Sequence, residues 1–400
     1  MGAGEVLKRR RKGSALATRQ NKFAAMLKNL HGTKGPAVSQ AELNTVFASQ
    51  GQFTSCRGGV FSRLKGATLD GLNLANRNLK EVDFSGTSLV GANLYGSNLS
   101  RASLYCADLR NCNLQNANLE GADLRGASFR GAKLSYAVLD RADLGAAMMM
   151  YVGPESASIV DRSDLSDDSA GNGGGVDFSN CRMHYTSFGN TKLVNVKFDG
   201  AIMVAANFKG AEFVNSSFRG AVLMGVNMKE LKVPPEALKG CVMDVSAAAI
   251  AKAAELRARL DAHQAWVASD GSRGAVAVLD DEDLRPLHKD FAGKKLVGLS
   301  ARRSLAFGVD FSGCQLQGAK FNDADLRDAN FSNADLRGAS LKGAKLAHAR
   351  LDGANLCSLR LLHGGVVPPD LSESEVIPEQ FLRAHLDNDI ASLLTGSTAR

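Results

Sequence analysis

The chain has 400 residues, enough for two or three domains, but only 6% of them are aromatic, while 41 are glycine and 8 are proline. Its seven cysteines are odd in number and include no Cys-x-x-Cys pair, which argues against a disulfide framework or a zinc site and predicts a reducing, cytoplasmic environment. The formal net charge of +7 is uneven: residues 1–60 hold ten Lys and Arg against two acidic residues, which leaves the remainder at −1.

Residues 1–36 are expected to form a basic N-terminal arm that is partly disordered or helical. Adjacent cations lead into a segment whose apolar residues Phe23, Leu27 and Leu30 would share one face of a helix. Such an arm can dock on nucleic acid or on an anionic membrane, or it can simply lead into a capping helix. The residues that would contact an anionic partner are Lys8, Arg9, Arg10, Arg11, Lys12, Arg19 and Lys22.

A large apolar residue recurs at every fifth position from Leu64 to Met149, and the residue two positions earlier is usually small, as in GADLRGASFRGAKL at 121–134. A period of five would scatter the leucines around an α-helix and would alternate them between the faces of a flat strand. All of them can be buried together only if the chain turns once per pentad. We therefore predict a solenoid whose coils stack by backbone hydrogen bonds at about 4.8 Å.

The A-(D/N)-L-x-x pattern of these pentads resembles the pentapeptide-repeat family. The resemblance implies an all-β solenoid, a right-handed quadrilateral β-helix with four pentads per coil. In that fold the central Leu or Phe and the small residue two before it point inward, and the other three positions face solvent. Leu104, Leu124 and Leu144 are therefore expected to lie one above another. The resemblance implies little about function, because surfaces differ between members.

Interruptions of the repeat predict two β-helical modules with short helical caps and a helical connector. The first module is expected at 37–243, with an irregular acidic loop at 150–177 before the pentads resume at Phe178 and run to Met228. Residues 244–288 are predicted to form the connector, because one helix there would carry an apolar face made of Ile250, Ala254, Leu256, Leu260 and Trp266.

The second module is expected at 289–371, with pentads in phase from Phe311 to Leu361. Its predicted end is the Val-Pro-Pro sequence at 367–369, since adjacent prolines cannot donate ladder hydrogen bonds. Residues 372–400 are predicted to form a C-terminal helical cap whose apolar side chains are Phe381, Leu382, Leu386, Ile390 and Leu394.

No combination of residues in the sequence supports catalysis. The seven histidines are dispersed and have no partner at metal-ligand spacing, and the glycine run at 171–175 lacks the context of a dinucleotide site. We therefore predict a protein that is not an enzyme and has no catalytic, cofactor-binding or metal-binding residue, no cofactor and no small-molecule substrate. The cysteines at the small position are predicted to be buried packing residues: Cys112, Cys181, Cys241 and Cys314.

Two kinds of function remain. The first is a cytoplasmic scaffold that binds a protein partner through the flat faces of the β-helix. The second is association with nucleic acid or with an anionic membrane through residues 1–36, which would make the protein peripheral to the membrane. Some members of the family mimic DNA with strongly acidic faces and protect topoisomerases. Residues 61–149 hold ten basic and eight acidic residues, which disfavours such mimicry.

Overall fold

The computed structural model describes residues 37–48, 64–145, 148–152, 157–161, 175–388 and 390–391. The chain divides into two compact units, Met1–Asp244 and Val245–Arg400, and each has a hydrophobic core of its own. The cations predicted to meet an anionic partner all precede residue 37 and lie outside the described residues. No helix in the described part of the chain is long and apolar enough to span a bilayer.

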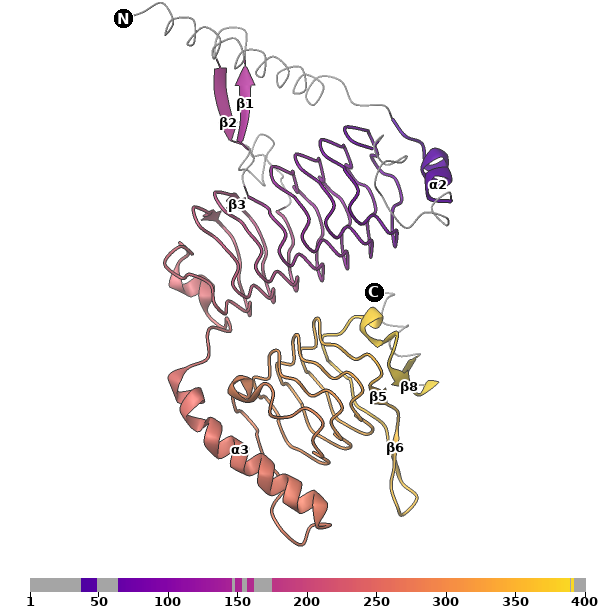
Figure 1. Cartoon of the computed structure of the whole chain (residues 1–400), viewed down its shortest axis with the longest axis vertical. Coiled ribbons are helices and arrows are strands. Elements are labelled where there is room, and N and C mark those ends of the chain that lie inside the picture. The colour runs from indigo at the N-terminus through magenta and orange to yellow at the C-terminus, as the bar shows by residue number, and fades with distance from the viewer. Residues whose placement is uncertain are drawn as a thin grey trace, which may run out of the picture. The chain divides into compact units, whose positions relative to one another are not determined.

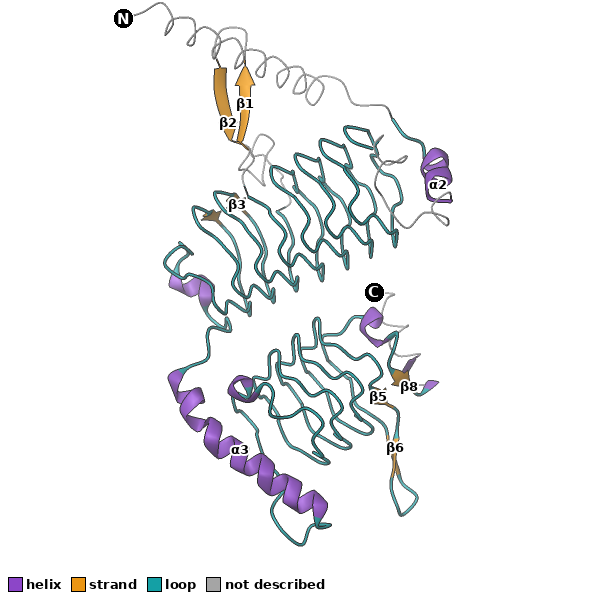
Figure 2. Cartoon of the chain, viewed as in Figure 1, coloured by secondary structure: helices purple, strands orange, loops and turns teal. Residues whose placement is uncertain are grey.

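Both units are solenoids in which the chain completes one coil about every 20 residues. Parallel bridges join Asn73 to Asn93 and Asn93 to Asn113 in the first unit, and Gln315 to Asp335 in the second. The coils are visible as stacked loops in Figures 1 and 2, and most of them are drawn without arrows because each extended stretch is very short. The β-helical solenoid predicted from the five-residue period is confirmed, with four pentads in each regular coil.

The interior of the first unit is a set of apolar columns. Leu104, Leu124 and Leu144 lie in one of them, as predicted, and each is at most 1% exposed. Their coils are joined by backbone hydrogen bonds from the N–H of Leu104 to the carbonyl of Asp123 and from the N–H of Leu124 to the carbonyl of Asp143. Burial of each such Leu stabilises the fold by about 1.5–3 kcal/mol.

Each corner of a coil needs a residue in the left-handed conformation, two positions after the central Leu or Phe. Gly96 (φ 61°) and Asn116 (φ 58°) occupy this position on neighbouring coils. Glycine adopts this conformation without steric cost, and Asn does so more readily than most other residues, so the two recur at the corners. At Gly96 a Cβ would also lie 2.3 Å from Oδ1 of Asn76 on the adjacent coil.

In the described part of the first unit, helix α2, Gln40–Ala48, lies beside the first coil. Leu43 on this helix is fully buried and belongs to the core of the unit. The side chain of Gln40 accepts a hydrogen bond from the N–H of Asn73 at 2.8 Å and donates one to its carbonyl at 3.1 Å. The helix therefore satisfies backbone groups at the open end of the stack.

The last rung of the first unit comes after its two prolines. The 3-10 helix η3, Pro235–Leu238, precedes Val242, which is bridged to Val222 on the previous coil. Two short strands in the same unit, β3 (Lys192–Val194) and β4 (Glu212–Val214), pair in parallel as one longer rung.

The first array is interrupted by a hairpin. Strands β1, Met148–Val152, and β2, Ala157–Asp161, pair antiparallel, and the ladder resumes with the bridge between Lys133 and Asp177. The prediction of an irregular loop over 150–177 is therefore wrong for the residues in these strands. Met149 is also wrongly assigned to a pentad, because it pairs with Val160 in the hairpin. Runs rich in Val, Ile and Tyr favour such strand pairing over a corner of the coil.

Helix α3, Ala247–Ala268, opens the second unit. Ser246 is its N-cap and accepts a hydrogen bond from the N–H of Ala249 at 3.1 Å. The buried stripe differs from the predicted face, since Ile250 is 60% exposed and Ala254 is exposed as well. Ile250 lies one turn before the stripe begins, and Ala254 lies beside it. The buried residues are Ala253, Leu256, Leu260 and His263.

The β-helix of the second unit begins inside the predicted connector 244–288, which is a correction. After α3 ends, Val278 is bridged to Ser300 and Asp283 to Leu305. This first coil is two residues longer than a regular one and contains the 3-10 helix η4, Arg285–Leu287. The extra residues shift the five-residue phase, which is why the period did not identify the first coil.

The end of the second unit also differs from the prediction. Strand β5, Asn355–Leu356, pairs in parallel with β8, His385–Leu386, so the chain makes a further coil beyond the prolines at 368–369. The prolines lie in the connection before the bridging residue Asp370, where no ladder N–H is required. The central residues of this coil resume the period of five: Leu371, Val376, Phe381 and Leu386.

Two further predictions for this end of the chain are wrong. Leu361 is not a pentad centre but lies in a hairpin made by β6, Leu359–Arg360, and β7, Val366–Val367. The described residues of the expected helical cap at 372–400 are largely β-helix, because their apolar side chains stack on the previous coil. Among the described residues of that range, helix is limited to the 3-10 turn η5, Pro378–Phe381, and to positions 388 and 390–391.

Candidate interaction surface

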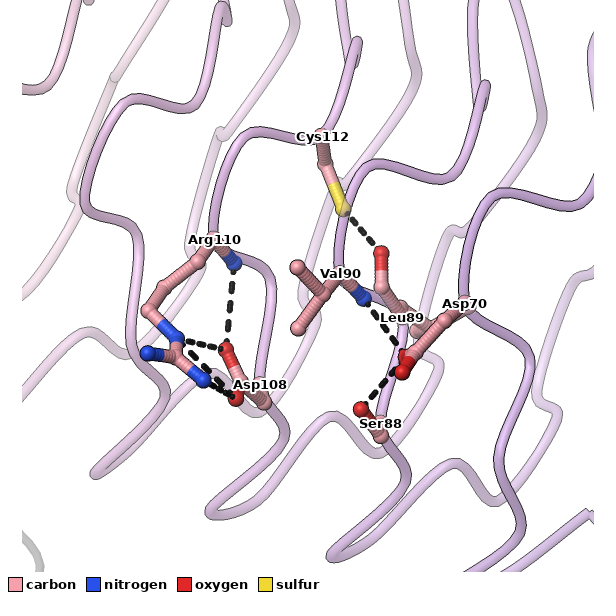
Figure 3. Close-up of polar contacts among 7 residues, drawn as sticks. All are labelled: Asp70, Ser88, Leu89, Val90, Asp108, Arg110 and Cys112. Atoms are coloured by element: carbon pink, nitrogen blue, oxygen red, sulfur yellow. Dashed lines mark hydrogen bonds and ion pairs between the residues drawn. The ribbon is translucent and has the colours of Figure 1, made fainter.

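The polar surface of both units is built from three positions of each pentad: the residue before the central one and the two after it. The residue before it is usually Asp, Asn or Ser, and its side-chain oxygen often accepts a hydrogen bond from the N–H two residues later. Asp108 accepts in this way from the N–H of Arg110 at 3.2 Å (Figure 3). Asn93 accepts likewise from the N–H of Tyr95 at 3.2 Å. These Asx turns hold the outward side chains in fixed positions at the corners.

Some of these side chains also join neighbouring coils. Asp70 accepts hydrogen bonds from the N–H of Val90 at 3.0 Å and from the hydroxyl of Ser88, both on the adjacent coil (Figure 3). In the same way, Asp199 accepts from the N–H of Arg219 at 3.0 Å. The surface is therefore rigid across coils as well as within each pentad.

Where a pentad reads Asp-Leu-Arg, the arginine folds back on the aspartate. Nε and Nη2 of Arg110 donate to the two carboxylate oxygens of Asp108 at 2.8 and 2.6 Å, in the arrangement drawn in Figure 3. Arg125 makes the same two bonds to Asp123, both at 2.8 Å. A two-point bond of this kind orients the planar guanidinium, although a half-exposed pair contributes little to stability.

Arg125 has further neighbours on the coils on either side. The centre of its guanidinium lies 5.5 Å from the ring centroid of Tyr105, and its Nε lies 3.8 Å from a carboxylate oxygen of Asp143. The Arg125 side chain remains 47% exposed. We call Tyr105, Asp123, Arg125 and Asp143 the Arg125 face; it extends over three successive coils of the first unit.

The charges of the Arg125 face stabilise one another. Burial acts to raise the pKa of Asp123, but hydrogen bonds from the side chain and N–H of Arg125 outweigh it and hold this pKa below its ordinary value. The hydrogen bond with Asp123 raises the pKa of Arg125. Burial raises the pKa of Tyr105. At neutral pH the Arg125 guanidinium is thus paired with the Asp123 carboxylate and lies beside the neutral phenol of Tyr105.

Of the cysteines at the small position, Cys112, Cys181 and Cys314 are buried packing residues, as predicted, whereas Cys241 is only partly buried against the core. The thiol of Cys112 is fully buried and donates to the carbonyl of Leu89 at 2.7 Å (Figure 3). Thr87 occupies the equivalent position one coil and one pentad earlier, and its hydroxyl makes the matching bond to the carbonyl of Leu64 at 2.7 Å. Burial raises the pKa of Cys112 to about 12, so this thiol is unreactive near neutral pH.

His263 packs against the beginning of the second β-helix. Its Nδ1 accepts a hydrogen bond from the N–H of Ala277 at 2.9 Å, and its ring centroid is 5.7 Å from that of Trp266. Burial lowers the pKa of His263. No group of three or more His, Cys, Asp or Glu in the described part of the chain is arranged to hold a metal ion.

A polar hollow lies beside α2 in the first unit. Amide side chains and one guanidinium could form hydrogen bonds with a ligand there, but this lining contains no nucleophile with a neighbouring base. The lining residues are Gln40, Asn44, Asn73, Ala75, Asn76 and Arg77.

The Arg125 face was not identified from the sequence. The cations that the sequence did single out, at 8–12, 19 and 22, lie outside the described residues. Tyr105 and Arg125 are 20 residues apart, which is one full coil, and each directly follows the central Leu of its pentad. That spacing was a usable signal once the coil length was assumed.

Comparison with known proteins identifies the family. The family model for pentapeptide repeats matches in eight copies, at residues 78–116, 112–147, 201–232 and 319–357. Together with the coil geometry, this shows that the chain belongs to the pentapeptide-repeat family. No curated protein matches the chain.

Several solved pentapeptide-repeat structures are similar to parts of the chain. The protein alr5209 from Nostoc PCC 7120 is 33% identical over 27% of this chain and 85% of its own length, with a TM-score of 0.17. HetL from Nostoc sp. strain PCC 7120 is described as involved in heterocyst differentiation regulation. It is 17% identical over 77% of this chain and 86% of its own length, with a TM-score of 0.21. QnrB1, a plasmid-mediated fluoroquinolone resistance protein, is 15% identical over 85% of this chain and 93% of its own length, with a TM-score of 0.22.

Proposed function

We propose that the protein is a non-catalytic scaffold that binds a protein partner through a flat face of its first β-helix, with the Arg125 face at the centre of contact. The observation that supports this most directly is the fixed position of Arg125 between Asp123, Asp143 and the ring of Tyr105. Arginine and tyrosine are the residue types that most often dominate binding energy at protein interfaces.

Rigidity strengthens this proposal. Arg125 and Tyr105 follow central leucines that are fully buried, and the backbone of each pentad is bonded to the coils on both sides. A side chain that is already held in its bound orientation loses little conformational entropy when a partner arrives. Because the guanidinium is only half covered, its free edge can donate to a carboxylate or carbonyl of the partner.

The charge pattern indicates the chemistry of the partner. The face carries two carboxylates around one guanidinium, so a partner of uniformly negative or positive charge would meet a like charge. A protein surface with an acceptor opposite Arg125, an apolar contact for Tyr105 and donors for the two aspartates fits this face best.

The experiment is capture of partners by the immobilised full-length protein, quantified by mass spectrometry for the wild type and three variants. Arg125→Ala and Tyr105→Ala are expected to lower recovery of the partner by about tenfold or more, as removal of an interface anchor does. Arg101→Ala is the matched control, because Arg101 is a 71% exposed arginine that is not part of the Arg125 face and pairs only loosely with Glu81 at 3.7 Å. A partner retained equally by all three variants would exclude the Arg125 face.

A second candidate function is supported by the charge distribution. Ten of the 48 Lys and Arg lie in residues 1–60 with only two acidic residues, whereas the rest of the chain is nearly neutral. Duplex DNA or anionic vesicles should therefore bind the full chain at low salt and lose it steeply as salt rises. Replacing the five cations at 8–12 by Gln should remove most of this binding. Titrations in which the wild type fails to bind either polyanion at low salt would exclude a role for the arm.

A further inference from the structure

The second unit carries a hairpin that the solenoid does not need. Regular coils in this unit repeat every 20 residues, but Asn355 of β5 pairs with His385 of β8, which is 30 residues later. Ten residues are therefore inserted into the last coil. The insertion forms the antiparallel pair β6–β7, closed by a bond from the N–H of Leu361 to the carbonyl of Gly365 at 2.8 Å. Figure 1 shows this hairpin projecting from the side of the stack, at the label β6.

The hairpin exposes apolar side chains to solvent. Leu362 at its tip is fully exposed, Leu361 is 48% exposed, and Val366 and Val367 are 59% and 37% exposed. Most large apolar residues in the coils of this unit are buried, although Val278 and Leu382 are exposed as well. An exposed cluster of large apolar side chains on a projecting element marks a surface that is covered by something else when the protein functions.

The charge of the hairpin restricts what can cover it. Between Asp352 and Asp370 the sequence contains Arg360 and His363 but no carboxylate. Arg360 is exposed and lies opposite Val366 in the register of the hairpin, a few residues from the leucines of the tip. An apolar tip with a cation near its base is complementary to the apolar interior and the phosphate headgroups of a phospholipid layer.

The base of the hairpin is held firmly against the coil. A Cβ at Gly338 would lie 2.7 Å from Cβ of Leu359 and 3.1 Å from the carbonyl oxygen of Val367, so the hairpin packs directly on the backbone there. Gly338 also has a positive φ of 64°, which favours glycine. The tip is therefore presented in one orientation, and insertion of its leucines does not require the β-helix to rearrange.

We propose that the tip of the β6–β7 hairpin, Leu361 and Leu362, inserts into the surface of a phospholipid membrane while Arg360 meets the headgroup phosphates. A second copy of the chain is a poorer occupant, because a stable dimer buries roughly 800 Å² on each partner and this hairpin offers only four exposed apolar side chains. Insertion of two leucines gives weak and reversible attachment, so this site would act together with another contact. The proposal is independent of the Arg125 face and of the basic arm.

The test uses the full-length protein with the cations at 8–12 replaced by Gln, so that the arm does not contribute. Its partition onto phosphatidylcholine vesicles, with and without phosphatidylserine, is measured by co-sedimentation. The double variant Leu361→Ser/Leu362→Ser is expected to lower the partition coefficient by about tenfold or more. Ile250→Ser is the matched control, since Ile250 is 60% exposed on α3, and it should change the coefficient by less than about twofold.

A second measurement reports insertion directly. Leu362→Trp adds a tryptophan to a chain that has one, Trp266, and vesicles with brominated acyl chains should quench its fluorescence beyond the quenching seen for the parent protein. The proposal is overturned if the parent does not bind vesicles of either composition. It is also overturned if the double serine variant partitions like the parent, or if the added tryptophan is not quenched. Specific binding of the hairpin in a groove of a partner protein would then be the remaining use of this surface.

Discussion

Leu124→Asp is expected to lower the free energy of unfolding of the first unit by at least about 4 kcal/mol. Leu124 is fully buried in its column between Leu104 and Leu144, so the change removes a buried leucine and places an unpaired carboxylate in an apolar interior. Chemical denaturation followed by circular dichroism measures the loss. The matched control is Leu362→Asp, the same substitution at a fully exposed leucine, which should cost no more than about 0.5 kcal/mol. Equal losses in the two variants would contradict the inward orientation of Leu124.

Phe198→Ala is expected to destabilise the first unit by about 3–5 kcal/mol. Phe198 is fully buried, and its ring stacks on the rings of Phe178 and Phe218, with centroid distances of 5.5 and 5.1 Å. The rings of Phe198 and Phe188 are also in a T-shaped contact, with their centroids 5.7 Å apart. Backbone hydrogen bonds hold neighbouring coils in place, so the coils cannot move together to fill the cavity that the substitution leaves. The loss of unfolding free energy should therefore lie at the upper end of this range.

Thermal and chemical unfolding compare Phe198→Ala with Tyr185→Ala. Tyr185 is an aromatic residue of the same unit that is 59% exposed, and its main ring contact is a guanidinium, that of Arg141, 5.9 Å from the ring centroid. Its removal should cost less than about 1 kcal/mol. If the Phe198→Ala protein were as stable as the Tyr185→Ala protein, packing among the stacked phenylalanine rings would not contribute the stability expected here.

The regular part of the fold was predictable because it follows from a single repeated physical requirement. A period of five leaves the chain one way to bury every central residue, and four pentads per coil then place Leu104, Leu124 and Leu144 in one column. The same argument was misleading wherever residues were inserted. Two extra residues at η4 shifted the phase, so Leu279 was overlooked. The ten extra residues at the β6–β7 hairpin kept the phase but took Leu361 out of the stack, so Leu361 was wrongly assigned.

The prediction at the C-terminal end failed for a related reason. Phe381, Leu382 and Leu386 are compatible with one side of a helix when they are considered alone. Phe381 and Leu386 also form a period of five with Leu371 and Val376. This pattern prevails because the preceding coil has unpaired backbone groups and an uncovered apolar column, which these residues bond to and bury. Leu382, which a helix would have buried, is 81% exposed.

The candidate site was beyond sequence reasoning for a different reason. Asp123 and Arg125 lie in the same pentad and their bond could be anticipated, but the contacts with Tyr105 and Asp143 join separate coils. Which coils are neighbours depends on the coil length. The side-chain directions that bring a ring under a guanidinium depend on corners held by Asx turns. Neither quantity is a property of the local sequence.

The sequence by itself determined the period, the inward residues, the family and the concentration of positive charge at the N-terminus, because each of these depends on composition or on fixed spacing along the chain. The tertiary structure alone decided where coils begin and end, which residues become hairpins, and which polar side chains meet across coils. Those outcomes depend on the backbone hydrogen bonds and apolar contacts between one coil and the next. Such contacts can form only after the chain has turned back on itself and placed the two coils side by side.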